Sequence, residues 1–157
     1  MATLTKEMLN ELTDEDVKIL KNFGKDLTES GTSVYVDKKG SRNEVFLKPM
    51  STSQLRKFFG ALKRIQADFE RFKDEIPLLQ PKLAYVAGKD KDKDKDKYKY
   101  KDKDKGTHDK VPKTKIWDFY NEISPLISEI NGDEKKFKNF VSIVEAIIAY
   151  HKFFGGE

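Results

Sequence analysis

Apolar residues recur at helical spacing along most of the chain. In residues 53–73, SQLRKFFGALKRIQADFERFK, successive apolar positions lie three, one, three, three, four and three residues apart, as on one face of an α-helix. The same periodicity follows Pro112 and fills the last stretch before Gly155 and Gly156. The pattern therefore predicts an all-α fold, a small bundle of about five helices, in a single helical domain spanning 1–157.

Capping and breaking residues predict where the first helices begin and end. Residues 4–27 are expected to contain a helix capped by Thr13 or Asp14, which Gly24 ends or interrupts. The basic helix is expected to start after the serines and threonine at 51–53, which can cap it. We expect this helix to end between Lys73 and Ile76, before Pro77.

The stretch LLQPKLAYVAGK, residues 78–89, predicts a short helix after the basic one. The residues expected to pack inward from this helix are Leu79, Leu83, Tyr85 and Val86.

Residues 28–50 are ambiguous. The segment VYVDKKGSRNEVFL resembles two short strands around a glycine-containing turn, but it also fits an ordered loop. A two-stranded hairpin by itself is only marginally stable in water, so we favour the loop.

Residues 89–110 are predicted to form a flexible Lys/Asp-rich insert, a disordered charged loop. In a helix, alternation of lysine and aspartate places like charges at every i,i+4 contact, and a strand would segregate the two charges onto opposite faces. Almost no apolar side chain is present to offset the entropy of ordering. Tyr98 and Tyr100 could stack on bases, but a solvated linker is the simpler interpretation.

The composition argues against an enzyme. The chain has no cysteine and only two histidines, His108 in the charged run and His151 on the apolar face of the last helix, where a packing role is expected. No HExxH, GxGxxG or P-loop pattern occurs, and Trp117 is most simply a core residue. We therefore predict no catalytic residues, no metal ligands and no cofactors.

No segment approaches the roughly 20 apolar residues of a membrane-spanning helix, and the N-terminal stretch has no apolar leader. No membrane partner is therefore expected, and the absence of cysteine fits a cytoplasmic location.

Positive charge is concentrated in two stretches, residues 51–88 with the basic helix and the run 89–105, each with an excess of three. Residues 51–88 hold 7 Lys/Arg against 4 Asp/Glu, although the whole chain carries a net charge of only +4. On a helical wheel the basic side chains lie opposite the apolar face, and Gly60 and Ala67 lie among them, where small side chains allow close approach of a polymer. Arginine forks suit phosphate, so this face is either a phosphate-binding surface or an ordinary solvated one.

Three stretches carry a resemblance to a known family: STSQLRKFF at 51–59, PKLAYVAGK at 81–89, and FKNFVSIVEAIIAYHKFFGGE at 137–157. In order and content they resemble the small subunit of the type III-A CRISPR effector, the Csm complex. The closing EAIIAYHKFFGG is the most specific part. The lysine-aspartate run departs from the family, whose connection here is usually shorter and less repetitive.

The resemblance implies a compact helical subunit with no catalytic activity. It implies that several copies stack along the guide RNA and its target RNA and contact the phosphate backbone. The implied protein partners are the repeated backbone subunit, the large polymerase-like subunit and neighbouring copies of this chain.

Candidate RNA-binding residues come from two sources. The motifs supply Gln54, Arg56, Lys89 and Lys152, with Lys89 standing where the family typically has an arginine. The helix geometry adds five further cations: Lys48, Lys57, Lys63, Arg64 and Arg71. Three other motif residues, Tyr85, Glu145 and Tyr150, are interpreted as structural or interface residues.

A protein–protein adaptor is the alternative function. In that case the aromatic-rich last helix forms the interface and the basic face is merely solvated. Salt distinguishes the two, because phosphate contacts weaken steeply with salt and apolar contacts do not.

Overall fold

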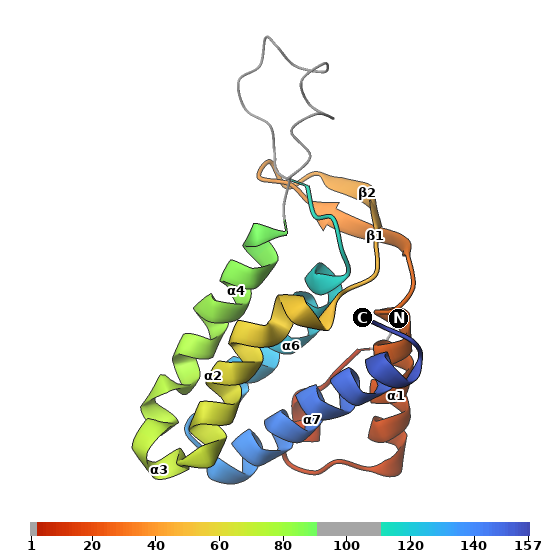
Figure 1. Ribbon diagram of the computed structural model, residues 1–157. Coiled ribbons are helices and arrows are strands. Elements are labelled where there is room, and N and C mark those ends of the chain that lie inside the picture. The colour runs from red at the N-terminus through yellow and green to blue at the C-terminus, as the bar shows by residue number, and fades with distance from the viewer. Residues whose placement is uncertain (1–2, 91–110) are drawn as a thin grey trace.

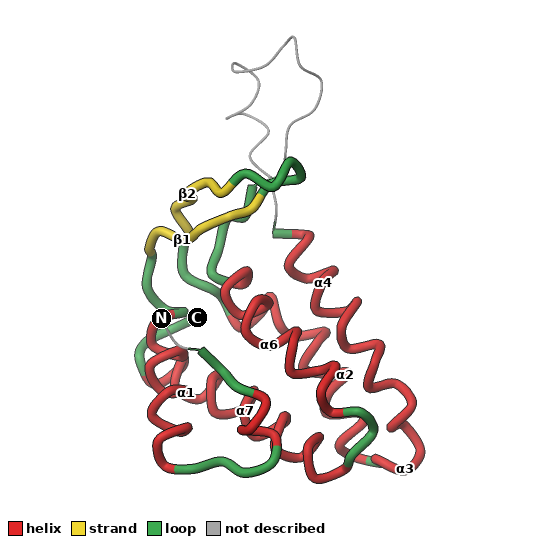
Figure 2. The backbone as a smooth tube through the Cα atoms, turned by 180° about the vertical axis from the view of Figure 1, so that it is seen from behind, coloured by secondary structure: helices red, strands yellow, loops and turns green. Residues whose placement is uncertain are grey.

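The computed structural model describes residues 3–90 and 111–157, and the predicted flexible insert lies almost entirely outside them, together with His108, Tyr98 and Tyr100. Within the described residues the fold is a helical bundle with one small hairpin (Figures 1 and 2). The five longer helices are α1 (Asp14–Asp26), α2 (Arg56–Ala67), α4 (Leu79–Lys89), α6 (Ile116–Ile130) and α7 (Glu134–Phe153). The predicted bundle of about five helices is therefore confirmed.

Short elements connect these helices. They are the 3-10 turns Lys6–Leu9, Thr52–Leu55 and Lys73–Leu78, and the one-turn helix α3 (Phe69–Phe72). Strands β1 (Gly31–Val36) and β2 (Arg42–Leu47) form the hairpin between α1 and α2.

Polar side chains cap helices α1 and α7, and the sequence predicted the first of these caps, Thr13. The Thr13 hydroxyl accepts a hydrogen bond from Asp16 N, and the Asp16 carboxylate accepts one from Thr13 N, which together form a capping box at the start of α1. Asp133 caps α7 in a similar way through Lys136 N. These local hydrogen bonds fix where the helices begin.

One contiguous apolar core joins the helices. The inward faces of α6 and α7 supply nearly half of the buried core residues, and Phe58 of α2 packs edge-on against Phe119 of α6, with ring centroids 6.3 Å apart. His151 lies in this core, where its Nε2 is 2.8 Å from the carbonyl oxygen of Met50. The expected packing role of His151 is therefore confirmed.

Gly24 does not end α1, as the sequence suggested, but lies buried inside it. A Cβ at this position would be 2.8 Å from the Cβ of Tyr150 and 2.9 Å from the carbonyl oxygen of Ile147. The missing side chain therefore lets α1 approach the backbone of α7 closely, and this approach, rather than a helix end, explains the glycine.

Residues 28–50 are a hairpin with a loop before and after it, so the preference for a loop throughout was wrong. The two strands pair antiparallel from Gly31 opposite Leu47 to Val36 opposite Arg42. The hairpin is not isolated, because Lys48 at its end pairs with Thr114 and the Tyr35 ring packs on Trp117 at a centroid distance of 6.4 Å. Stability estimated for a lone hairpin therefore did not apply here.

The basic helix is shorter than expected. Asp68 has a non-helical backbone, φ −148° and ψ 78°, and separates α2 from α3. The short helix after it is confirmed as α4, with Leu79 and Leu83 buried, but Tyr85 is 61% exposed rather than packed inward. Tyr85 therefore lies on the surface.

A buried lysine ties the start of α6 to the end of α1. Lys115 is buried, and its Nζ lies 3.0 Å from an Asp26 carboxylate oxygen and 3.2 Å from the Asp26 carbonyl oxygen. Burial raises the pKa of the neighbouring Asp118 carboxyl, and a hydrogen bond from the Ser33 hydroxyl opposes that shift. Among the described helices, none is long and apolar enough to cross a membrane.

Candidate nucleic-acid interface

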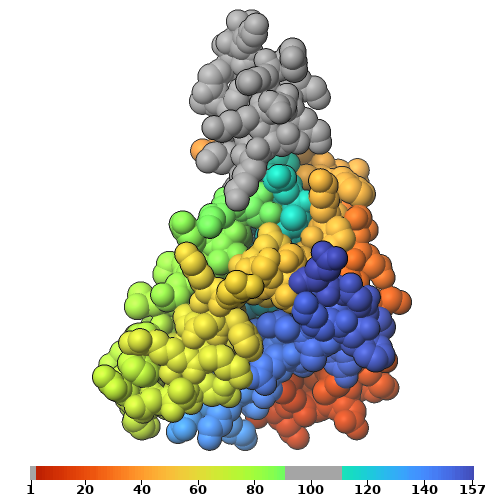
Figure 3. All heavy atoms as spheres, in the orientation of Figure 1, coloured from red at the N-terminus to blue at the C-terminus, as the bar shows by residue number. Residues whose placement is uncertain are grey.

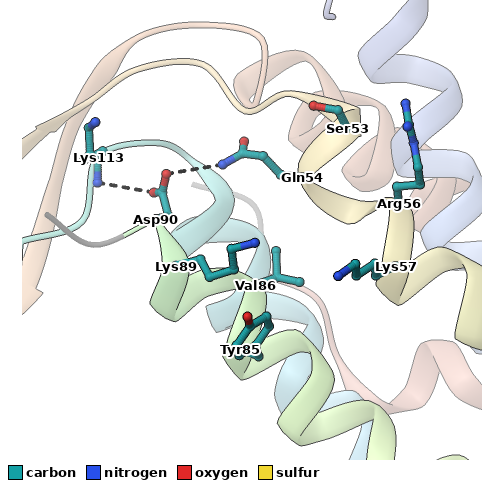
Figure 4. A pocket seen from close by; sticks show the side chains of 9 residues that line it. All are labelled: Ser53, Gln54, Arg56, Lys57, Tyr85, Val86, Lys89, Asp90 and Lys113. Atoms are coloured by element: carbon teal, nitrogen blue, oxygen red, sulfur yellow. Dashed lines mark hydrogen bonds between the residues drawn. The ribbon is translucent and has the colours of Figure 1, made fainter. Parts of the chain in front are cut away.

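A pocket of about 300 Å³ opens where the start of the basic helix meets the end of α4 (Figure 4). Its sides come from the 3-10 turn and first turn of α2, the last turn of α4, and the segment that enters α6. The lining residues are Ser53, Gln54, Arg56, Lys57, Tyr85, Val86, Lys89, Asp90 and Lys113. The pocket therefore brings together four of the nine predicted RNA-binding residues. Three come from the start of the basic helix, and Lys89 comes from the end of α4.

A capping box builds one side of this pocket. The Ser51 hydroxyl accepts from Ser53 N, and the Gln54 side-chain oxygen accepts from Ser51 N at 2.9 Å. The Gln54 amide nitrogen donates to Asp90 and to Thr114, each at 3.2 Å. Both ends of the Gln54 side chain are thus engaged within the protein, which favours a positioning role over direct contact with RNA.

Asp90 joins the three segments that line the pocket. One carboxylate oxygen accepts from Gln54, and the other accepts from Lys113 N at 3.3 Å, Thr114 N at 2.8 Å and the Thr114 hydroxyl at 3.0 Å. The residue is buried, and its carboxylate points toward Gln54 and Lys113 rather than into the opening (Figure 4). Asp90 therefore holds the pocket together without presenting its carboxylate to a ligand.

The cations around the pocket have no ion pairs with described residues. The side chains of Arg56, Lys57 and Lys113 make no ion pair with any described residue. Lys89 also lacks an ion pair within the described part of the chain, and its ammonium lies over the Tyr85 ring, 5.5 Å from the centroid. Four cations around one opening, without a carboxylate partner in residues 3–90 and 111–157, favour a positive potential there, which attracts anions.

The other cations of the basic helix are engaged. Lys63 pairs with Glu145 of α7, and Arg64 Nη2 lies 3.4 Å from a Glu75 carboxylate oxygen. The guanidinium groups of Arg64 and Arg71 both stack on the Phe72 ring, 4.1 and 5.1 Å from its centroid. These three cations, Lys63, Arg64 and Arg71, are referred to below as the distal group. Lys63 and Arg64 are paired with carboxylates, whereas Arg71, like Lys89, contacts only an aromatic ring among the described residues.

The last two predicted cations lie outside the pocket. Lys48 is exposed beside it, and its backbone pairs with the Lys113–Lys115 segment. Lys152 lies at the end of α7, and its Nζ is 3.3 Å from the carbonyl oxygen of Glu157. The Glu157 carbonyl also accepts from Thr52 N and the Thr52 hydroxyl, so Lys152 is near the start of the basic helix.

Sequence reasoning missed two residues of the pocket. Lys113 directly follows the low-complexity run and belongs to no periodic pattern, so no sequence signal marked it. Asp90 was treated as one more member of the alternating run, although it is buried and accepts four hydrogen bonds. Only the fold separates this aspartate from those that follow it.

The pocket has the chemistry of an anion site and lacks that of a catalytic one. Its described lining includes no histidine, and the carboxylate that this lining does include, that of Asp90, is used in hydrogen bonds. In residues 3–90 and 111–157 no group of histidine and acidic side chains is arranged to hold a metal ion. Outside the pocket, the exposed face of α2 continues between α4 and α7, with nothing within 4 Å of a Cβ built on Gly60 (Figure 3).

The chain is similar to one known family. The family described as Csm2 Type III-A matches residues 34–157, which is most of the sequence and includes every residue of the pocket. Comparison with the curated proteins and with the solved structures gave no match.

Proposed function

Because this chain belongs to the Csm2 family of type III-A CRISPR effector subunits, we propose that its pocket and basic helix bind the phosphate backbone of guide RNA and target RNA. Csm2 is a non-catalytic structural subunit of the Csm complex, which contains the guide RNA. The proposal concerns which residues contact RNA and which subunits this one contacts. Several copies would stack along the duplex, next to one another, the repeated backbone subunit and the large polymerase-like subunit, in the cytoplasm.

The observation that carries the proposal is the set of unpaired cations around the pocket. Arg56, Lys57, Lys89 and Lys113 surround one opening and have no carboxylate partner among the described residues. Cations that line one opening raise the local positive potential, and an anion that binds there reduces their mutual repulsion. A phosphate chain supplies such anions without any need for sequence recognition, which guide pairing provides.

The exposed side of α2 extends this site into a track. From Arg56 to Ala67 the helix rises roughly 17 Å, enough to follow several nucleotides of one strand. Gly60 and Ala67 are exposed on this side, as the sequence predicted. A strand entering at the pocket can therefore lie along the helix toward Arg64 and Arg71.

Two triple variants test the proposal, each removing three positive charges. One changes the pocket cations, Arg56→Gln, Lys57→Gln and Lys89→Gln, and the other changes the distal group, Lys63→Gln, Arg64→Gln and Arg71→Gln. Binding of the full chain to labelled single-stranded RNA is measured across a salt series, and target binding is then measured in the assembled complex. We expect the pocket variant to lose more affinity, because none of its cations is paired with a described carboxylate, whereas two of the three distal cations are.

The salt dependence identifies the cause. Each phosphate of single-stranded RNA that the variant no longer neutralises should reduce the log–log slope by roughly 0.7. A pocket variant that binds RNA like the wild type in both the free chain and the complex contradicts the proposal. Equal losses of affinity in the two triple variants would instead extend the site over the whole basic face.

Enlarging Gly60 tests whether RNA lies along α2. Gly60→Gln adds a neutral side chain in open space on the exposed side, so the fold should tolerate it while a closely lying strand should not. We expect weaker RNA binding with an unchanged salt slope. Gly60→Ala is the matched control and should bind normally, and normal binding by Gly60→Gln would place the strand elsewhere.

An adaptor function has one observation in its favour. Phe153 is 76% exposed and Phe46 is 64% exposed, and large exposed aromatic side chains are common at protein interfaces. Contacts with other subunits through these residues are compatible with RNA binding through the pocket. The adaptor alone would be supported if salt did not affect RNA association and both charge variants entered the complex normally.

A further inference from the structure

We infer that Tyr85 is a stacking platform for an unpaired nucleobase, so that the pocket binds one nucleotide as a unit, phosphate and base together. This inference rests on the proposed RNA-binding function and adds the kind of RNA that the pocket takes. It assigns a ligand-contacting role to a residue that the sequence suggested was structural.

Tyr85 is placed as a platform rather than as a core residue. Its side chain lies on the exposed side of α4 and is 61% exposed. It lines the basic pocket and also an adjoining, mainly apolar groove of about 400 Å³ formed with Leu78, Pro81 and Val86. The ring therefore lies beside the pocket cations (Figure 4) and also lines the apolar groove, and these two surroundings match the phosphate and the base of a nucleotide.

The surrounding charge favours a polyanion over a protein segment of ordinary composition. Lys57 and Lys82 line the groove, and Lys89 lies over the Tyr85 ring at 5.5 Å. Among the described residues, the one acidic residue lining either space is Asp90, whose carboxylate is turned away and hydrogen-bonded. A second copy of this chain docking through the same face would bring these cations together.

The pocket is of a size that suits a single nucleotide. A pocket of about 300 Å³ is at the lower end of the range for small-molecule sites. A duplex can lie across such an opening but keeps its base faces stacked inside the helix. Aromatic side chains stack on bases that are unpaired, and do so with little sequence preference because every base has a flat face.

The test compares three RNA ligands and three forms of the full chain. The ligands are a single-stranded oligoadenylate, an abasic ribose-phosphate chain of equal length, and a duplex of equal length. The forms are the wild type, Tyr85→Phe, which keeps the ring, and Tyr85→Leu, which keeps apolar bulk on an exposed helix. Titrations are followed by NMR at low salt, so that millimolar affinities are still detected.

We expect Tyr85→Leu to weaken oligoadenylate binding by about 5-fold or more and to leave the abasic chain and the duplex unaffected. Tyr85→Phe should behave as the wild type. Equal binding of oligoadenylate by all three forms overturns the inference. So does a loss that Tyr85→Phe shares, which would assign the effect to the hydroxyl, or a loss that extends to the abasic chain.

The abasic chain separates this inference from the proposed function. If it binds the wild type in a salt-dependent way and Tyr85→Leu has no effect, phosphate binding stands and base stacking fails. If no RNA shifts any signal at millimolar concentration, both fail. A Tyr85→Leu protein that binds all RNA normally but no longer enters the Csm complex would show that Tyr85 contacts another subunit.

Discussion

Replacing Gly24 with alanine is expected to lower the free energy of unfolding by about 2–3 kcal/mol. The added Cβ would lie 2.8 Å from the Cβ of Tyr150 and 2.9 Å from the carbonyl oxygen of Ile147. Neither atom is at the end of a flexible side chain, so the clash can be relieved only if α1 and α7 move apart. Alanine is intrinsically better than glycine inside a helix by about 1 kcal/mol, but the clash should exceed that gain.

Thermal and urea unfolding measure the effect of Gly24→Ala, with Gly60→Ala as a matched control. Gly60 is also inside a helix, but nothing lies within 4 Å of a Cβ built there. The same substitution should therefore stabilise at Gly60 and destabilise at Gly24, with the Gly24 variant melting roughly 4–12 °C lower than the wild type. A gain in stability at both positions would show that α1 and α7 are not so closely packed.

Asp90→Asn is expected to destabilise the fold by about 2–3 kcal/mol and to weaken RNA binding at the same time. The carboxylate accepts from Gln54, Lys113 N, Thr114 N and the Thr114 hydroxyl. An amide has only one oxygen and turns its NH₂ group toward some of these donors. The three segments that line the pocket then lose their common link.

The direction of the RNA effect makes Asp90→Asn informative. Removing a negative charge next to four cations should tighten binding to a polyanion if charge alone matters. We expect the opposite, because the cations lose their fixed spacing. Glu129→Gln, an exposed position on α6, removes the same charge and should leave stability and binding nearly unchanged. Tighter RNA binding by Asp90→Asn would refute the positioning role.

The sequence predicted those parts of the fold that depend on local periodicity. The helices α4, α6 and α7 follow from apolar spacing and from breaking residues, since both act within one turn. The hairpin was missed because its stability comes from contacts between Tyr35 and Trp117 and between Lys48 and Thr114, which are far apart in the chain. The role of Gly24 was predicted wrongly because the residues that require a glycine at this position lie in α7, not in α1.

The candidate site was also predicted only in part, again because some of its features depend on contacts between distant segments. The basic face of α2 and Lys89 could be chosen from charge pattern and from family motifs. The distal group contacts Glu145, Glu75 and Phe72, and the sequence does not show that these residues lie near it. The difference between the pocket cations and the distal group therefore could not be predicted. Lys113 and Asp90 could not be recognised at all, because only the folded chain brings the two sides of the insert together.

The hydrogen bonds of Asp90 also bear on how this protein can vary in length. Asp90 is the last described residue before the segment 91–110, and its carboxylate holds Lys113 and Thr114 just beyond that segment. Asp90 and Lys113, on the two sides of this segment, therefore lie close together and are joined by these hydrogen bonds. Doubling the length of such a loop costs only about 0.6 kcal/mol in closure entropy. A connection of another length could therefore join Asp90 to Lys113 at little cost in free energy, while the hydrogen bonds of Asp90 keep the geometry of the pocket.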